Sequence, residues 1–278
     1  MSNPVLAWWI VLCTLGGLNL LLWLLSARAL QRRRPLMPAG LYAARRLQLM
    51  LSAVFVLGCA YRSVLPVHDI ARHCVVDSWL SNVLLGRSVA TLAELSFAAQ
   101  WALLLGEMAR VHDSAVARTT ARALLPTIVL AELCSWYAVL TRAHLGHVIE
   151  ESLWTLAAGF VVASLVVLWP RCAAANRRRL AALAAAGAAY ILFMLHVDVP
   201  MYWTRWLADE ASGQPYLSLA QGLLDAARPC VLSWRWEDWR AEIAWMTLYF
   251  SVAVWLSIAM VHAPDLRTDS PRGDARAV

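Results

Sequence analysis

Seven apolar stretches dominate the chain, and each reaches or approaches the roughly 20 residues that a helix needs to cross a lipid bilayer. They lie near 5–26, 47–66, 82–106, 123–141, 152–169, 180–198 and 244–263. Apolar residues make up 61% of the 278 residues and charged residues only 15%, far from the balance of a soluble domain. The sequence therefore predicts an all-α integral membrane protein with seven transmembrane helices. Six spans is the main alternative, because the fifth and sixth stretches are rich in alanine and valine and closely spaced.

The placement of arginine predicts how the helices are oriented in the membrane. The connections 27–46, 107–122 and 170–179 and the tail after 263 hold sixteen of the 24 arginines. The opposite connections mix arginine with acidic residues. Because cytoplasmic loops carry the excess of positive charge, we expect the N-terminus outside and the C-terminus in the cytoplasm.

The first stretch is expected to be an anchor that is kept. It is too long for the apolar region of a signal peptide, lacks a basic segment before it and is followed by an arginine cluster. We expect a single seven-helix transmembrane domain over 1–263. Residues 264–278 are rich in proline, aspartate and arginine, which is typical of a disordered cytoplasmic tail.

One sizeable segment, 199–243, is expected to lie outside the spans on the outer side. It begins at Pro200, and 215–228 has the pattern of a short amphipathic helix. Four indole side chains follow: Trp234, Trp236, Trp239 and Trp245. Since indole rings prefer the lipid–water interface, this segment is predicted to be an aromatic belt or a lid over an outward-facing pocket.

The chain has no lysine. A retinal Schiff base is therefore excluded, although the number of spans matches a rhodopsin. Replacement of lysine by arginine throughout is typical of a GC-rich genome, and we place the protein in the plasma membrane, most readily a bacterial inner membrane. The pI near 9.3 reflects loops that face anionic lipid, and nothing in the sequence favours nucleic-acid binding.

Two glutamates, Glu94 and Glu132, lie at the middles of the third and fourth spans. A carboxylate at this depth is costly and usually marks a pathway, a proton site or a ligand site. Both residues are predicted at nearly the same level on consecutive helices. Two carboxyl groups close together in a low dielectric would not both ionise, which suits proton exchange or acid–base catalysis. The alternative is a structural network that only fixes helix packing.

A layer of cationic groups is predicted outward of the two glutamates. From the helical rise, Arg62, Arg87 and His196 are each displaced outward by about 10 Å from the middles of their spans. Arginine in such a layer suits recognition of a carboxylate or a phosphate headgroup, while salt bridges or snorkelling to the interface are the alternative. Arg87 and Glu94 are two helical turns apart, which predicts no easy direct bond.

Further candidates lie near these groups. Trp136 and Tyr137 follow Glu132 on the fourth span and are candidate ligand contacts, and Asp198 follows His196 as a candidate catalytic partner. A weak metal candidate is formed by the turn-spaced residues His144, His147 and Glu151. Their spacing matches no zinc signature such as H-E-x-x-H.

Of the six cysteines, only Cys74 and Cys230 are predicted on the oxidising outer side. They can form a disulfide there, which would attach the 199–243 segment to the connection before the third span.

These observations favour an outward-facing polar pocket within the membrane that binds an anionic or amphiphilic small molecule or lipid. The same groups could transform that ligand, and we favour an enzyme over a receptor because acid, base and anion-binding residue types converge. A proton-coupled carrier or ion pathway ranks second, since the inner halves of the spans carry few polar groups. A structural membrane subunit ranks third. The ligand, any cofactor and the oligomeric state are not readable from the sequence.

Overall fold

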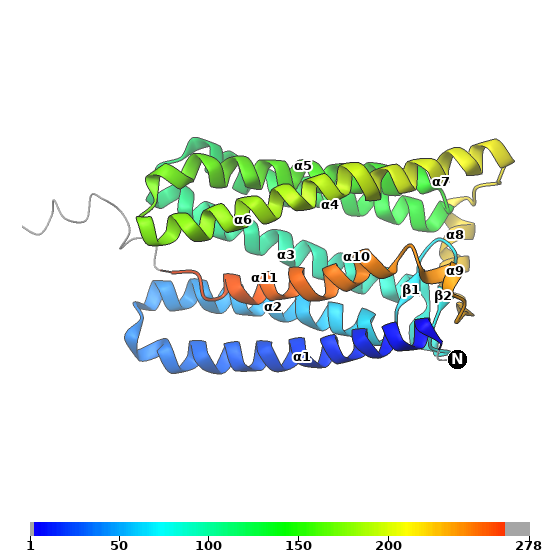
Figure 1. Ribbon diagram of the computed structural model, residues 1–278, viewed down its shortest axis with the longest axis horizontal. Coiled ribbons are helices and arrows are strands. Elements are labelled where there is room, and N and C mark those ends of the chain that lie inside the picture. The colour runs from blue at the N-terminus through cyan, green and yellow to red at the C-terminus, as the bar shows by residue number, and fades with distance from the viewer. Residues whose placement is uncertain (1–2, 265–278) are drawn as a thin grey trace, which may run out of the picture. The chain divides into compact units, whose positions relative to one another are not determined.

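A computed structural model describes residues 3–264, and most of them are helical (Figure 1). The longer helices are α1 (Pro4–Arg33), α2 (Ala39–Val64), α3 (Val83–Val111), α4 (Ala115–Thr141), α5 (His144–Leu168), α6 (Ala174–Phe193) and α7 (Val199–Ser212). The shorter ones are α8 (Leu219–Ala226), α9 (Trp236–Trp239), α10 (Ile243–Leu248) and α11 (Val254–Met260). The strands are β1 (Val67–His68), β2 (His73–Cys74) and β3 (Val231–Leu232).

Seven helical segments within residues 3–264 are long and apolar enough to cross a membrane. They run over Pro4–Leu36, Ala39–Val64, Val83–Val111, Ala115–Thr141, His144–Arg171, Asn176–Ser212 and Ile243–Met260. The prediction of seven helices, rather than six, is confirmed. Most segments extend several residues beyond the predicted apolar stretches, because a helix continues into its polar ends until a cap or a proline stops it.

The start of α1 illustrates how the sequence sets such an end. The side chain of Asn3 accepts hydrogen bonds from the backbone N–H groups of Val5 and Leu6, and Pro4 occupies the first helical turn. Both are favoured helix-start features. Asn3 also donates to the carbonyl of Trp234 at 3.1 Å, so the cap attaches the helix start to a segment far along the chain.

The described residues fall into two compact units. The first comprises 3–100, 139–142 and 216–263, and the second comprises 101–138, 143–215 and 264. In the first unit, α1, α2 and α11 pack against one another (Figure 1). In the second unit, α5 packs against α6 and α7.

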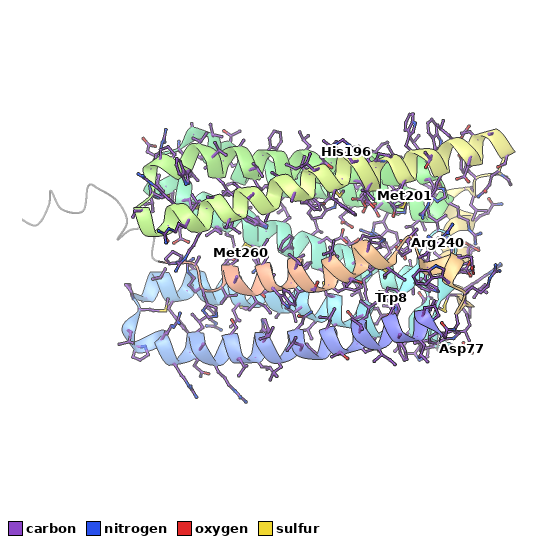
Figure 2. All side chains as sticks on the ribbon, viewed as in Figure 1. Trp8, Asp77, His196, Met201, Arg240 and Met260 are labelled. Carbon is purple, nitrogen blue, oxygen red and sulfur yellow. A yellow bond between two sulfur atoms is a disulfide. The ribbon has the colours of Figure 1, made fainter. Side chains whose placement is uncertain are left out.

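The core of the first unit is rich in aromatic side chains from distant parts of the sequence. Trp8, labelled in Figure 2, packs against Trp239 with ring centroids 5.6 Å apart. Trp239 is fully buried and donates to the carbonyl of Ser233 at 3.0 Å. The predicted interfacial position is therefore wrong for Trp239, because its N–H finds a partner inside the protein and its ring fills the core. Trp236, by contrast, is exposed.

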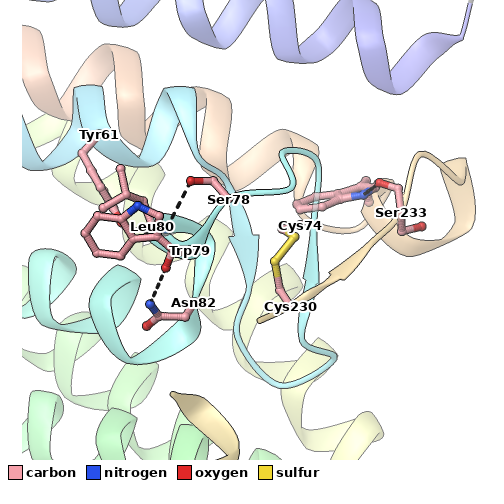
Figure 3. The surroundings of a disulfide bond; sticks show 9 residues. Tyr61, Cys74, Ser78, Trp79, Leu80, Asn82, Cys230 and Ser233 are labelled. Atoms are coloured by element: carbon pink, nitrogen blue, oxygen red, sulfur yellow. Dashed lines mark hydrogen bonds between the residues drawn. A yellow bond between two sulfur atoms is a disulfide. The ribbon is translucent and has the colours of Figure 1, made fainter. Parts of the chain in front are cut away.

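The three short strands form one small sheet in the order β1-β2-β3. β1 and β2 are antiparallel, and β3 runs parallel to β2 with Cys74 opposite Leu232. Cys74 and Cys230 are joined by a disulfide with their Cα atoms 5.9 Å apart (Figure 3). Beside it, the Ser78 side chain accepts from the Leu80 N–H and Asn82 donates to the Trp79 carbonyl (Figure 3). The disulfide thus joins the connection after α2 to the segment after α8.

A carboxylate clamp holds α8 in the first unit. Asp225 accepts hydrogen bonds from Arg72 at 2.9 Å and from Arg142 at 2.9–3.2 Å. Both arginines have a left-handed backbone, with φ of 59° and 60°, a conformation that costs energy for a side chain of this size. Gly222, one turn before Asp225, lies directly against the carbonyl of Leu140, so α8 can approach only because this position has no side chain.

The predicted outer segment starts later than expected. The chain stays helical from α6 through a π-helical turn at Met194–Asp198 into α7, and the helix ends at Ser212 (Figure 1). Pro200 does not stop it, because the π-helical turn before it changes the backbone hydrogen-bond pattern and accommodates the missing N–H donor. The amphipathic helix expected within 215–228 is present as α8. The predicted disordered tail falls on residues that, apart from Pro264, lie outside the described range.

Candidate functional site

Glu94 is buried on α3, with 6% of its surface exposed. Arg87, on the same helix, donates from Nη2 to its Oε2 at 3.1 Å. The prediction that these residues are too far apart for a direct bond is wrong. The glutamate side chain leans toward the N-terminus of the helix, and the long arginine side chain spans the remaining turn to meet it.

A π-helical turn brings a second donor to Glu94. The turn at Tyr249–Ala253 links α10 to α11, and Tyr249 donates its hydroxyl to Oε1 of Glu94 at 3.3 Å. The carbonyl of Phe250 in this turn accepts a hydrogen bond from Asn19 at 2.7 Å. Such turns are rare and often occur at functional sites. Here the turn aims a phenol at a buried carboxylate.

Arg62 on α2 completes this cluster in the first unit. Its Nη1 lies 3.9 Å from Oε1 of Glu94, which is an ion pair but not a hydrogen bond. The guanidinium also lies over the rings of Trp245 and Phe250, 5.9 and 5.7 Å from their centroids. Only 7% of Arg62 is exposed, yet its side chain makes no hydrogen bond to any of residues 3–264. None of its nitrogens is among the fully enclosed side-chain atoms that lack a partner in residues 3–264, so its donors keep a small contact with the surface beside the charge and the aromatic rings.

A close helix contact explains why Arg62 and Glu94 meet. A Cβ atom on Gly58 would lie 2.8 Å from Cβ of Ala93, so α2 and α3 approach more closely than two side chains permit. Small residues allow such contacts between membrane helices. Arg62 is one turn beyond Gly58, and Glu94 is next to Ala93. The backbone contact therefore places both charged groups in the same layer.

The second unit contains buried titratable groups of its own. Glu132 on α4 and Glu150 on α5 are both buried, and each offers a carboxylate oxygen within 4.8 Å of the other. His147 contacts Glu150 through Nδ1 at 2.6 Å. The first turn of α5 packs tightly on α4, because a Cβ on Gly146 would lie 2.6 Å from the carbonyl oxygen of Cys134.

The weak metal candidate takes a different form in the structure. His144 contacts Asp209 of α7 through Nδ1 at 2.6 Å, whereas His147 is engaged by Glu150. Among the described residues, His144, His147 and Glu151 are not gathered as a group of potential metal ligands. The ring of His147 instead packs on Tyr202, with centroids 4.9 Å apart.

The remaining sequence candidates differ in exposure. His196, labelled in Figure 2, is exposed, while Asp198 is buried. The two side chains therefore lie in different environments, although both belong to the π-helical turn. On α4, Trp136 is half-buried and Tyr137 is half-exposed. The structure therefore brings together Arg62, Arg87 and Glu94, but does not pair His196 with Asp198.

Sequence reasoning gave no role to Tyr249, Glu150 or Asp209. The spacing of His147 and Glu150, three apart on a helix, was a usable signal, because such residues share a face. No such sequence signal pointed to Tyr249, since a π-helical turn cannot be read from the hydrophobic pattern. Asp209 lies in a part of α7 that was expected outside the spans.

By the length and composition of its seven long helices, the chain is a polytopic, all-α membrane protein with buried carboxylates. No protein-family model, curated protein or solved structure matches the chain. Any function beyond this class must therefore be argued from the chemistry of the two clusters.

Proposed function

We propose that this membrane protein binds an anionic or amphiphilic small molecule, or a lipid, through the cluster formed by Arg62, Arg87, Glu94 and Tyr249. The observation that carries the proposal is the buried guanidinium of Arg62, which makes no hydrogen bond to any of residues 3–264. Its donors keep a small contact with the surface, so a ligand can reach them. A carboxylate or phosphate would supply the missing acceptors, and the planar fork of arginine matches both groups.

The surroundings of Arg62 support an organic ligand. The rings of Trp245 and Phe250 lie beside its guanidinium, and aromatic side chains favour the apolar part of an amphiphile. Glu94 adds a negative charge within 3.9 Å, which would hold the arginine in place until an anion arrives. We propose that the ligand enters from the outer side, on the orientation expected from the arginine-rich connections, in a plasma membrane such as a bacterial inner membrane.

A chemical step on the bound molecule remains part of the proposal. Glu94 and Tyr249 could exchange a proton with a ligand held by Arg62, because they lie 3.3 Å apart beside it. A receptor would use the same groups for binding alone.

A panel of amphiphilic carboxylates and phosphates tests the binding proposal. The full-length protein in detergent micelles would be titrated with each compound, and the shift in melting temperature recorded. Arg62→Met should abolish the response to the compounds that shift the parent. Arg46→Met, the same change at an exposed arginine of α2, is the matched control and should leave it intact. Equal responses in the two variants would refute binding by Arg62.

The second unit favours proton transfer as a second candidate function. Glu132 and Glu150 place two carboxylate oxygens within 4.8 Å, and His147 lies against Glu150. Two carboxyl groups this close in a low dielectric hold a shared proton more readily than two negative charges. A proton-coupled carrier needs such a site.

Infrared spectroscopy distinguishes this candidate from a purely structural cluster. A protonated carboxyl group in a protein gives a carbonyl-stretch band that an ionised carboxylate lacks. If the pair stores a proton, the parent should show the band at neutral pH, and both Glu132→Gln and Glu150→Gln should remove it. Glu210→Gln, on the exposed surface of α7, should not. A parent spectrum without the band would rule out proton storage here.

A further inference from the structure

An apolar groove of about 390 Å³ opens between α1 and α11 in the first unit. Its walls come from Leu22, Leu25 and Ala29 on one helix and from Trp255, Ile258 and Ala259 on the other. Trp255 is fixed by a hydrogen bond from its Nε1 to Oδ1 of Asn19 at 3.0 Å. The groove is therefore a shaped feature with a held indole wall.

The groove contains one polar pair. Ser26 and His262 complete its lining, and Oγ of Ser26 lies 2.7 Å from Nε2 of His262. Ser26 is buried. When the serine donates to Nε2, the ring proton sits on Nδ1, and His262 can donate it to a ligand.

Positive charge lies at the same end of the groove. Leu22, Ser26, Ala29 and Arg33 follow one helical stripe on α1, so Arg33 continues the groove face beyond its apolar part. Burial, and then the charge of Arg33, lower the pKa of His262. Arg45 donates from Nε to the carbonyl of Ala263 at 2.9 Å, next to His262.

We propose that this groove binds an anionic phospholipid, with an acyl chain along the apolar walls and the phosphate at Arg33 and His262. An acyl chain fits a lining that is apolar except for Ser26 and His262, and a phosphate fits the guanidinium of Arg33. A second copy of the chain is a poorer occupant. Docking through the same face would bring the arginines of the two copies together. The site is independent of the cluster around Arg62.

The proposal is tested with lipids of one acyl composition and two headgroups. The full-length protein in detergent micelles would be titrated with phosphatidylglycerol or phosphatidylcholine, with the melting temperature as readout and native mass spectrometry to count bound lipid. Phosphatidylglycerol should raise the melting temperature at lower concentration than phosphatidylcholine. Glycerol 3-phosphate, a headgroup without chains, should have no effect; a full response to it would show a free-phosphate site instead.

Two variants address the two halves of the site. Arg33→Gln should raise the half-saturating concentration of phosphatidylglycerol roughly fivefold, as expected for one arginine near a lipid headgroup. Ala29→Trp should fill the groove and abolish the preference. The controls are Arg28→Gln and Leu24→Trp, at exposed positions of α1 off the groove stripe.

The outcomes separate the occupants. Equal responses to both lipids, or an unchanged preference in Arg33→Gln and Ala29→Trp, would overturn the proposal. A dimer in native mass spectra that Ala29→Trp disrupts would assign the groove to a second copy and overturn it as well. If Ala29→Trp fails to fold, Arg33→Gln alone decides, because Arg33 is exposed and its replacement spares the core.

Discussion

The guanidinium of Arg62 stops 3.9 Å from the carboxylate of Glu94, beyond hydrogen-bond distance. Arg87 reaches the same carboxylate at 3.1 Å and donates to it. The two arginines therefore have different roles. Arg87 fixes Glu94 in place, whereas Arg62 keeps its donors available, and this difference gives the first prediction.

Replacement of each arginine by methionine should lower stability to a different extent. Removing one partner of a buried, hydrogen-bonded ion pair costs about 3–5 kcal/mol, so Arg87→Met should lower the melting temperature strongly. Arg62→Met should lower it much less, because Glu94 keeps its hydrogen bonds from Arg87 and Tyr249 when Arg62 is removed. Thermal unfolding in micelles measures both. A large loss of stability in Arg62→Met would mean that this arginine is structural.

The Asp225 clamp should make the stability of the protein depend on pH in the acid range. Burial alone would raise the pKa of Asp225, but hydrogen bonds from Arg142 and Arg72 outweigh it, and the pKa lies below its ordinary value of 3.8. A carboxyl group whose pKa is lower in the folded state stabilises the fold above its unfolded pKa. That contribution is lost as the pH falls through the folded pKa.

Asp225→Asn measures this contribution. At neutral pH it should cost about 1–2 kcal/mol, as for loss of hydrogen bonds to a charged group. The difference in melting temperature from the parent should shrink as the pH falls below 3.8. Asp77→Asn, at an exposed position of the same unit, serves as the control and should match the parent throughout. A constant difference for Asp225→Asn down to the lowest pH would contradict the clamp.

Two glycines of α5 should respond differently to alanine. A Cβ on Gly146 would lie 2.6–2.8 Å from atoms of Cys134 and Ala138, whereas one on Gly159 would meet nothing within 4 Å. Backbone atoms cannot yield as a flexible side chain does, so Gly146→Ala should destabilise by roughly 1–3 kcal/mol or more. Gly159→Ala should be neutral or stabilising by up to about 1 kcal/mol. Equal melting temperatures for the two variants would argue against the close contact of α5 with α4.

Loss of the disulfide should weaken the first unit. Cys74 and Cys230 are 156 residues apart in sequence, and a native disulfide typically contributes about 2–4 kcal/mol. The double variant Cys74→Ser, Cys230→Ser should therefore unfold at a lower temperature than the parent under oxidising conditions, and the two proteins should converge when a reductant is added. A difference that persists in reductant would trace the effect to the serines rather than to the bond.

The apolar pattern was sufficient to predict seven helices, because the bilayer sets a length that few soluble elements share. It was less informative about where the helices end. Pro200 was read as a break, but the π-helical turn before it carries the helix on to Ser212. Local backbone adjustments of this kind leave no hydrophobic signature.

Only part of the candidate site was predicted, again because local changes of the backbone leave no signal in the hydrophobic pattern. The depth of Arg62, Arg87 and Glu94 follows from counting residues along straight helices, and the structure places the three side chains together. Tyr249 joins them only through a π-helical turn. Trp239, expected at the lipid interface from composition, is fully buried because a partner for its indole N–H lies six residues away at Ser233.

A density map of the full-length protein in lipid nanodiscs, at a resolution that shows side chains, tests the central proposal most directly. Binding by Arg62 predicts non-protein density at hydrogen-bond distance from its guanidinium, with a shape that accommodates a carboxylate or phosphate group. A map in which Glu94 has moved onto Arg62, with no other density beside it, would contradict the proposal and leave the cluster a structural ion-pair network.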